Sequence, residues 1–305
     1  MIQLNVKQEL GRRIRTAREE KKLTREDVCN DESELTIRQL LRIEKGECLP
    51  SLPKISYIAK KINIPIILLI DESYTMIPNN YLKQKNYLLK KSPYGKKENI
   101  EEIEEILDKL YTQYYDNLPE DEQLFIDLIQ SRVDFQFYDD HRFGEPIILD
   151  YIDHLFKKKY YTENDLILIE VYLHYLSLKK YNSNIVHSLL KKSINQTDIT
   201  LELSAFLLLK IVLACLNTFE INQDFKYFEF CLNTADVLMK EHNDFKKKPI
   251  VDMVRGKYYL FAKNDPKTAQ KYYKSGSNLA QIFGDDFLSK KILEEYEKDI
   301  RKNIN

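Results

Sequence analysis

Hydrophobic residues recur every three or four positions through most of the chain, which is the spacing of amphipathic α-helices. In the segment "VKQELGRRIRTAREEKK", Leu10, Ile14 and Ala17 fall on one stripe and charged residues occupy most of the rest. This pattern predicts a helix over residues 6–22. Glycine is rare, with 7 in 305 residues, which favours helices over a turn-rich sheet. We therefore expect an all-α protein.

Four more short helices are predicted in the first seventy residues. Thr24 and Thr36 are suitable N-caps for the second and third of these five helices, and Gly46 is a suitable residue to end the third. Ser51 opens a fourth helix that ends before Pro65, and "IILLI" predicts a short fifth. Five short helices with a short polar turn between the second and third indicate a helix-turn-helix organisation.

Helices also fill the rest of the sequence. A linker, "DESYTMIPNN", precedes a short basic helix, "YLKQKNYLLKK", and a break at "SPYGKK". Ten helices with short polar connections follow, which favours antiparallel hairpins stacked side by side. Their predicted spans are 100–116, 120–137, 146–159, 163–180, 183–193, 200–218, 223–241, 248–263, 266–283 and 287–302.

One of these hairpins matches a repeat template. In "GKYYLFAKNDPKTAQKYYKSG", small and large residues alternate as in a tetratricopeptide repeat, with one extra residue in the turn. Small residues let two helices approach, and tyrosines fill the remaining gap. Such pairs stack into a right-handed α-solenoid whose concave face binds peptides in many proteins. The positions are Gly256, Tyr259, Ala269, Tyr273 and Gly276.

The inner face of this hairpin would carry Met253, Lys257 and Leu260. An ammonium group on such a face is suited to hold the backbone or the terminal carboxylate of a bound peptide. Alternatively, Lys257 is an ordinary solvated lysine. We expect further peptide contacts at inward positions of neighbouring helices, His174 and Asn217, although His174 also fits a histidine packed in the core.

Charge is distributed unevenly along the chain. The net charge is -1, but residues 1–70 carry 14 Lys and Arg against 10 Asp and Glu, and the remainder carries 33 against 38. A basic head on an acidic body favours a nucleic-acid-binding domain joined to another module, although so small an imbalance also arises by chance.

No export or membrane signal is apparent in the sequence. The N-terminal segment has no apolar core of the kind found in signal peptides, and no uninterrupted apolar run approaches 18 residues. The cysteines form no CxxC pair and no metal-binding spacing with histidine. We therefore expect a soluble cytoplasmic protein with reduced thiols: Cys29, Cys48, Cys215 and Cys231.

Motifs for catalysis, metals or cofactors are not found. The chain has no glycine-rich nucleotide loop, no nucleophile elbow and no HExxH motif. We therefore expect neither an enzyme nor a bound metal or cofactor. The histidines are scattered: His141, His154, His174, His187 and His242.

The segment "LTIRQLLRIEKG" carries the strongest chemical signal. Arg38 and Arg42 lie four residues apart on one helix face, while Leu40 and Ile43 turn towards a core. The major groove of DNA admits one helix, and an arginine offers two parallel hydrogen bonds to guanine. Ile37 would be placed to meet a thymine methyl group. The alternative is a solvated stripe of arginines.

Other basic side chains lie near the ends of the predicted helices. In a helix-turn-helix complex such positions meet the phosphates of the duplex rather than its bases. The residues are Arg12, Arg13, Lys21, Arg25, Lys45 and Lys54.

The first seventy residues resemble the Xre/Cro-type DNA-binding domain in "LGRRIRTAREEKKLTRED", in "RIEKGECLPSLPKISYIAKKI" and in the spacing between them. The resemblance implies a structural ion pair between Arg18 and Glu44. The chain departs from the family at Arg25, where a glutamine is common, and its turn before the third helix is one residue longer. The base-reading positions that match the family are Thr36, Ile37, Arg38, Gln39 and Arg42.

Nearly the whole chain resembles the Rgg/PlcR (RNPP) family of peptide-sensing regulators of Gram-positive bacteria, and within it the ComR-type competence regulators. The stretches that carry the resemblance include "LPEDEQLFIDLIQS", "YYTENDLILIEVYLHYL" and "DFKKKPIVDMVRGKYYLFAKND". The domains implied are a helix-turn-helix domain (1–71), a linker with a short helix (72–99), a peptide-binding solenoid (100–286) and a C-terminal capping helix (287–305).

The resemblance implies a mechanism as well. A short hydrophobic signalling peptide binds the groove and releases a DNA-binding domain that an autoinhibitory contact, here Arg38 with Glu120, had held. The C-terminal helix then exchanges between protomers, and the resulting homodimer binds double-stranded DNA at an inverted-repeat operator.

Two alternatives stay open. The chain is a dimeric helix-turn-helix repressor that ignores peptides, or a repeat protein that binds or dephosphorylates a response regulator. The "TIRQLLRIEKG" segment argues against the second alternative, since such proteins carry a helical bundle in place of a helix-turn-helix domain.

Overall fold

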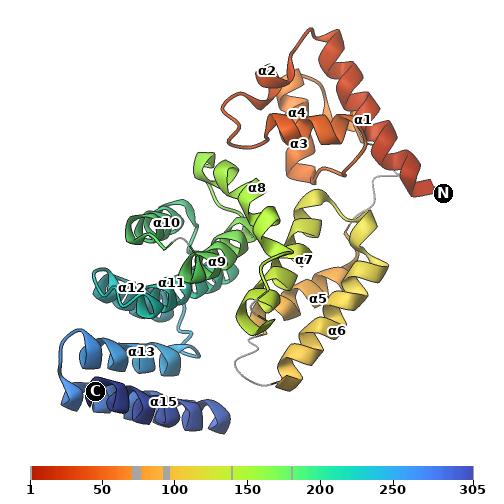
Figure 1. Cartoon of the computed structure of the whole chain (residues 1–305). Coiled ribbons are helices and arrows are strands. Elements are labelled where there is room, and N and C mark those ends of the chain that lie inside the picture. The colour runs from red at the N-terminus through yellow and green to blue at the C-terminus, as the bar shows by residue number, and fades with distance from the viewer. Residues whose placement is uncertain (1, 71–76, 92–96, 139, 180, 305) are drawn as a thin grey trace. The chain divides into compact units, whose positions relative to one another are not determined.

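The protein is described here by a computed structural model that covers residues 2–70, 77–91, 97–138, 140–179 and 181–304. Every regular element in these ranges is a helix, which confirms the expected fold class (Figure 1). The chain divides into two compact units, Met1–Val171 and Tyr172–Asn305.

The first unit begins with the helix-turn-helix domain. It comprises α1 (Ile2–Glu20), α2 (Arg25–Cys29), α3 (Ile37–Glu44), α4 (Leu52–Ile62) and a 3-10 turn (Ile66–Leu68). These helices have a hydrophobic core of their own, whose buried members all lie between Leu10 and Leu69. Burial of that apolar surface stabilises the domain without help from later helices.

Local sequence signals set the ends of these helices. Thr24 and Thr36 each form a capping box, in which the threonine side chain and the side chain three residues later satisfy each other's backbone N–H groups. Ser51 precedes α4 but makes no capping hydrogen bond. Gly46 follows α3 with φ +71, and a Cβ there would lie 2.7 Å from the Cα of Gln8, so no larger residue fits.

The remainder of the first unit packs α6 on α7 and α7 on α8. A π-helical turn (Asp134–Tyr138) follows α7. It includes the last residues of the helix predicted over 120–137, so the α-helix itself is shorter than predicted. The predicted linker 72–99 falls partly outside the described residues. The elements are α5 (Asn79–Lys90), α6 (Lys97–Gln113), a 3-10 turn (Tyr115–Asn117), α7 (Glu120–Val133), a π-helix (Asp134–Tyr138), α8 (Gly144–Lys157) and α9 (Glu163–Leu178), which ends in the second unit.

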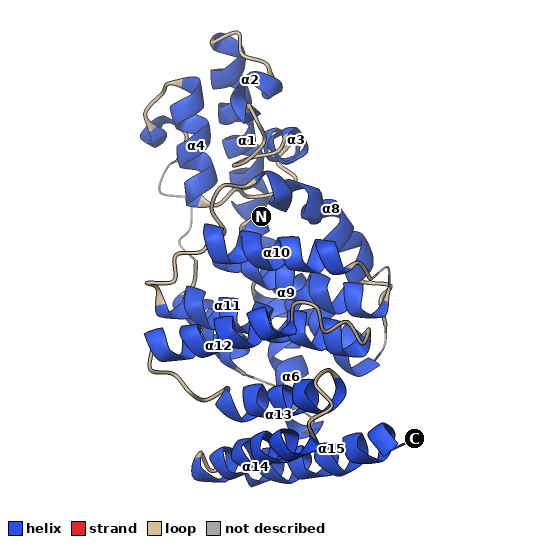
Figure 2. Ribbon diagram, turned by 90° about the vertical axis from the view of Figure 1, so that its left-hand side faces the viewer, coloured by secondary structure: helices blue, strands red, loops and turns tan. Residues whose placement is uncertain are grey.

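Antiparallel hairpins make up the second unit (Figure 2). In the α13–α14 hairpin a Cβ on Gly256 would lie 2.6 Å from the ring of Tyr273, so the small and large residues of the repeat template do meet. The final helix packs on both members of that hairpin. The elements are α10 (Ser183–Gln196), α11 (Glu202–Ile221), α12 (Phe228–Glu241), α13 (Lys248–Phe261), α14 (Pro266–Ile282) and α15 (Asp286–Ile304).

By length and composition, α11 is apolar enough to cross a membrane. The sequence analysis considered only uninterrupted apolar runs and so passed over this helix, which contains Lys210. Within its most apolar 18-residue window, 67% of the helix is buried inside the protein. That burial is typical of the core helix of a soluble protein.

Candidate functional site

A buried ionic cluster fixes the C-terminal end of α3. Arg18 donates to both carboxylate oxygens of Glu44, over 2.6 and 3.0 Å, and their side chains are only 8% and 1% exposed. The hydrogen bonding of Arg18 to the Glu44 carboxylate raises the pKa of Arg18. The structure therefore brings together the pair that the sequence analysis assigned to a structural role.

Arg25 belongs to the same cluster. Its Nη2 lies 2.8 Å from Glu44 Oε2, so a residue expected to contact phosphates also holds the C-terminal end of α3. A carboxylate can accept from two guanidinium groups because it offers about four lone-pair directions. The arginine that replaces the family's common glutamine thus adds a second cation to the buried Glu44.

We expect the two arginines of this cluster to contribute unequally to stability. Arg18→Gln should destabilise the domain by about 2–3 kcal/mol, because a buried carboxylate loses two charge-assisted hydrogen bonds. Arg25→Gln should cost only about 1 kcal/mol, since that side chain is partly solvated. Thermal unfolding of the two variants tests the difference, and equal losses would contradict the assignment.

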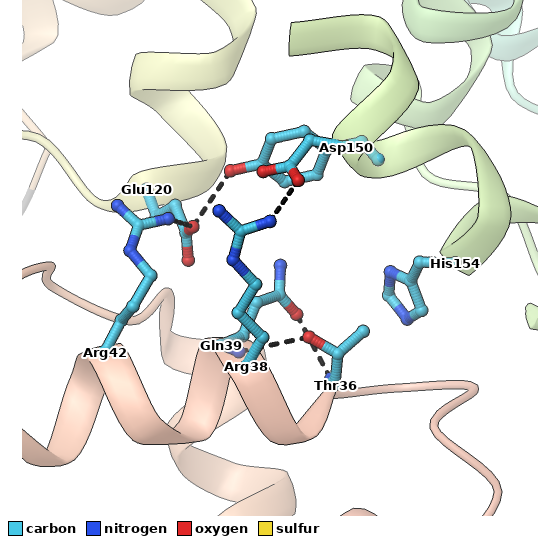
Figure 3. A pocket seen from close by; sticks show the side chains of 8 residues that line it. Thr36, Arg38, Gln39, Arg42, Glu120, Asp150 and His154 are labelled. Carbon is cyan, nitrogen blue, oxygen red and sulfur yellow. Dashed lines mark hydrogen bonds and ion pairs between the residues drawn. The ribbon is translucent and has the colours of Figure 1, made fainter. Parts of the chain in front are cut away.

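The outward face of α3 meets two later helices of the same unit (Figure 3). Arg38 pairs with Asp150 of α8, and Arg42 Nη1 lies 2.5 Å from Glu120 Oε1, at the start of α7. The Arg38 side chain remains 68% exposed, whereas that of Glu120 is only 4% exposed. Both arginines proposed to read bases are therefore paired with carboxylates.

The autoinhibitory contact was expected between Arg38 and Glu120, but in the structure Glu120 pairs with Arg42. The backbone explains the difference. The N–H of Glu120 donates to the carbonyl of Leu49 over 2.9 Å, and this brings the start of α7 close to the segment that follows α3. Arg42 lies one turn nearer to that segment than Arg38 does, and Asp150 of α8 pairs with Arg38 instead.

Glu120 has a dense set of neighbours. The hydroxyl of Tyr151 donates to Glu120 Oε1 over 2.9 Å, and Cys48 Sγ lies 3.7 Å from Oε2. Burial, together with the Glu120 charge, raises the pKa of Tyr151 and raises that of Cys48 to about 12. Burial, the largest single influence, would lower the pKa of Arg42, but the charge of Glu120 together with Cys48 and Tyr151 raises it overall. The Glu120 carboxylate is therefore surrounded by the hydroxyl of Tyr151, the thiol of Cys48 and the guanidinium of Arg42.

The next acid of α7 binds a second helix of the domain. Lys54 of α4 lies 2.5 Å from Asp121 Oδ1. Burial, the largest single influence, would raise the pKa of Asp121, but the charge of Lys54 and the hydrogen bonds from Lys54 and Ser51 together lower it. Lys54, which was expected to contact DNA phosphates, is therefore paired with a carboxylate of the first unit.

The third acid, Glu122, faces the interior of the unit. Lys85 of α5 lies 2.9 and 2.8 Å from its two carboxylate oxygens, and the Tyr81 hydroxyl donates to it over 2.6 Å. Asn164 of α9 donates to the carbonyl of Asp121 over 2.6 Å. The first turn of α7 is therefore held from behind by α5 and α9 while its front face holds the helix-turn-helix domain.

Between these groups lies a small polar pocket. His154 faces it, and burial followed by the charges of Lys158 and Lys54 lowers the pKa of His154 to about 4, so its ring is neutral at pH 7. The pocket is formed by side chains of α3, its N-cap, α7 and α8. It is lined by Thr36, Arg38, Gln39, Arg42, Glu120, Asp150, Tyr151 and His154.

The other predicted DNA contacts have different exposures. Gln39 is buried and occupied by the capping box, and Thr36 shares that box. Ile37 is half-buried against the domain's core. Lys45 is exposed, 3.7 Å from Glu47. Of the outward α3 side chains, Arg38 and Arg42 therefore have the reach to contact bases.

Lys257 is not a free cation in this structure. It is 7% exposed and lies 2.6 Å from Glu220 of α11, and 3.3 and 3.2 Å from Glu295 and Asp299 of α15. The other predicted inner-face residues, Met253 and Leu260, are also buried, and both α14 and α15 pack on α13.

The two other candidate peptide contacts lie on neighbouring helices of the second unit. His174 of α9 is half-buried and Asn217 of α11 is exposed. The hydroxyl of Thr218 donates to the carbonyl of Leu173 over 3.1 Å, so the two helices touch beside these candidates.

Several residues of the site were not predicted from the sequence, among them Asp150, Tyr151, His154 and Asn164. The segment "ILDYIDHLF" was predicted as a helix, but nothing in its pattern shows which acid faces another domain. The acidic run "EDE" after "LP" was the sequence signal for a contact at the start of this helix, since three consecutive carboxylates exceed what is needed to stabilise a helix N-terminus.

Comparisons with known proteins agree with this architecture. The ComR tetratricopeptide family matches residues 78–296. The apo form of the competence regulator ComR from Streptococcus vestibularis is 31% identical, with a TM-score of 0.85 over 96% of this chain and 99% of that chain. ComR from Streptococcus suis is 32% identical, with a TM-score of 0.81 over 96% of each chain.

A third solved structure contains ligands. ComR from S. thermophilus in complex with DNA and its signalling peptide ComS is 30% identical, with a TM-score of 0.68 over 95% of this chain and 99% of that chain. The chain is thus more similar in structure to the apo form than to this complex. No curated protein sequence matches the chain.

Proposed function

The chain belongs to the ComR family of competence regulators, and we propose from this premise that it is a DNA-binding transcription regulator switched on by a short signalling peptide. In the active form α3 enters the major groove of an inverted-repeat operator. Arg38 and Arg42 read bases, while Lys45, Lys54 and, at α1, Arg12 and Arg13 meet phosphates. The likeness to a ComR that is solved with DNA and a peptide supports this assignment.

One observation carries the regulatory part of the proposal. The two arginines that DNA needs are each paired with a carboxylate of the same unit, Arg38 with Asp150 and Arg42 with Glu120. A guanidinium cannot bind these acids and a guanine at once. The described conformation is therefore the resting state, and operator binding requires these contacts to break.

The energy needed for switching is modest. The contacts between the helix-turn-helix domain and α7–α8 described above are polar, whereas the domain's core is its own. An exposed ion pair such as Arg38–Asp150 contributes about 0–1 kcal/mol, and the pair of Arg42 with the buried Glu120 about 1–2 kcal/mol, so together they hold the resting state without locking it. A ligand that favours the released state by about 3 kcal/mol shifts the balance more than 100-fold.

The peptide site belongs to the solenoid in this proposal, within residues 100–286. His174 and Asn217 are the candidate contacts. Lys257 would reach a peptide carboxylate only by exchanging it for one of its present partners, such as Glu220. The C-terminal helix is the proposed element that builds the dimer.

The function is tested with DNA and peptides together. Duplexes that the protein retains from a random pool define the operator, and synthetic hydrophobic peptides of about eight residues are then titrated while operator affinity is followed. We expect operator affinity to rise with at least one such peptide. Salt-sensitive operator binding that no peptide changes would instead support the peptide-independent repressor.

Glu120→Gln should raise operator binding in the absence of peptide. The variant keeps the size of the side chain but removes the buried anion that pairs with Arg42, a loss of about 1–2 kcal/mol for the resting state. Operator affinity should rise about tenfold in a mobility-shift titration. Glu105→Gln, on the exposed side of α6, is the matched control and should leave it unchanged. Equal affinities for the two variants would refute a restraining role for Glu120.

A further inference from the structure

The turn between α2 and α3 has the wrong charge for a DNA-binding domain. It carries Asp31, Glu32 and Glu34 within a few residues of the recognition helix. DNA presents a dense row of phosphates, so carboxylates close to it oppose binding. An acidic turn beside a base-reading helix therefore calls for another partner.

The C-terminal end of α8 lies opposite this turn. Lys157 Nζ lies 3.1 Å from Glu32 Oε1, and Lys159 Nζ lies 3.7 Å from Asp31 Oδ2. The hydrogen bond from Lys157, the largest influence, lowers the pKa of Glu32, so its carboxylate is charged at neutral pH. In these two contacts the helix-turn-helix domain supplies the carboxylates and the end of α8 supplies the ammonium groups. In the Arg38 and Arg42 contacts, by contrast, the domain supplies the cations.

Glu32 is also attached to the recognition helix. Its second oxygen, Oε2, accepts the N–H of Ile37, the first residue of α3, over 3.3 Å. The backbone of Glu32 has φ +57, a left-handed conformation that is unfavourable for a residue with a Cβ. Contacts of the side chain at both oxygens help to hold the residue there. One carboxylate thus joins Lys157 of α8 to the first turn of α3.

We propose that the acidic turn Asp31–Glu34 is a second docking surface of the helix-turn-helix domain, whose partner is the lysine-rich C-terminal end of α8. Glu32 is the positioning residue that links this contact to α3. The domain presents cations at one contact and anions at the other. Only one orientation of the domain satisfies both contacts, because turning it by 180° would place like charges opposite each other. The turn therefore favours the docked state in two ways: its carboxylates bind the lysines of α8, and they repel the phosphates of DNA. The second effect rests on the proposed function; the first does not.

The test separates docking from DNA binding. Hydrogen exchange of the Glu120 amide reports docking without DNA, because that N–H bonds to the carbonyl of Leu49. Lys157→Glu replaces attraction by repulsion and leaves the helix-turn-helix sequence intact. We expect this amide to exchange about fivefold faster and operator affinity without peptide to rise by a similar factor. Lys109→Glu on α6, an exposed lysine with the same charge change, should alter neither quantity.

A compensating variant distinguishes repulsion from misfolding. Glu32→Gln combined with Lys157→Glu removes the repulsion and keeps an oxygen for the Ile37 N–H, so most of the amide protection should return. Unchanged exchange in Lys157→Glu, or no recovery in the double variant, would overturn the docking surface. If exchange behaves as expected and no variant binds any duplex specifically, the surface stands and the proposed function fails.

Discussion

Replacing Arg38 and Arg42 together with alanine is expected to weaken binding of the peptide-activated protein to its operator about a hundredfold or more. A well-oriented contact between an arginine and a base contributes about 1–3 kcal/mol of discrimination, and two such contacts multiply in the binding constant. Mobility-shift titrations at one fixed salt concentration measure the loss. Binding to random duplex should fall much less, because phosphate contacts from other basic residues persist.

Arg15→Ala is the matched control for this variant. Arg15 lies on α1, is exposed and pairs with Glu19, so its loss should change operator affinity little. The double variant should also release the resting contacts, since Asp150 and Glu120 lose their partners. Faster exchange of the Glu120 amide together with lost operator binding would be diagnostic. Retained operator binding would show that α3 does not read the bases.

Lys257→Met is expected to destabilise the second unit by about 3–5 kcal/mol, the usual cost of leaving buried charge without its partner. Lys257 holds Glu220 of α11 together with Glu295 and Asp299 of α15, and the hydroxyl of Tyr273 donates to Asp299 over 2.6 Å. Without the ammonium group, carboxylates from two helices repel one another beneath α15. Thermal unfolding should show the loss. Lys298→Met, an exposed partner of Glu295, should cost little.

The pH dependence of this variant has a definite sign. Burial, the largest single influence, would raise the pKa of Glu295, but the charge and hydrogen bond of Lys257, together with those of Lys298, lower it. In the natural chain that lowered pKa adds stability above the unfolded value of about 4.3, and the gain is lost as pH falls through the folded pKa. Without Lys257 the carboxylates should have raised pKa values, so acid should stabilise the variant. The stability gap between the two proteins should therefore narrow from pH 7 to pH 5, and a widening gap would contradict this account of Lys257.

Much of the DNA-binding domain follows from local sequence. The threonine caps, the burial of Leu40 and Ile43 and the pairing of Arg18 with Glu44 all appear in the structure as the pattern and the resemblance implied. These features depend on residues close in sequence, or on a core whose positions recur at helical spacing, so the spacing of residue types predicts them. The same holds for Gly256 and Tyr273, whose sizes must complement each other wherever two such helices meet.

The contacts between distant helices could not be derived in this way. The resemblance implied Glu120 as the partner of Arg38, but its pairing with Arg42 depends on where the hydrogen bond to Leu49 places the start of α7. The sequence placed Lys257 on a face open to a peptide or to solvent, but in the structure α15 packs on α13 and Lys257 is buried against it, which no periodicity shows. Partner choice across a fold is decided by packing angles and loop lengths, which a one-dimensional pattern does not contain.

Hydrogen exchange of the Glu120 amide with and without bound operator tests the central claim most directly, because this N–H is bonded to the helix-turn-helix domain through the Leu49 carbonyl. If α3 leaves Asp150 and Glu120 to enter DNA, the amide should be protected in the resting protein and lose that protection when operator and peptide are bound, while the core amides of α7 stay protected. Unchanged protection of the Glu120 amide in a stable operator complex would mean that the domain binds DNA without leaving α7, and the resting state described here would not be inhibitory.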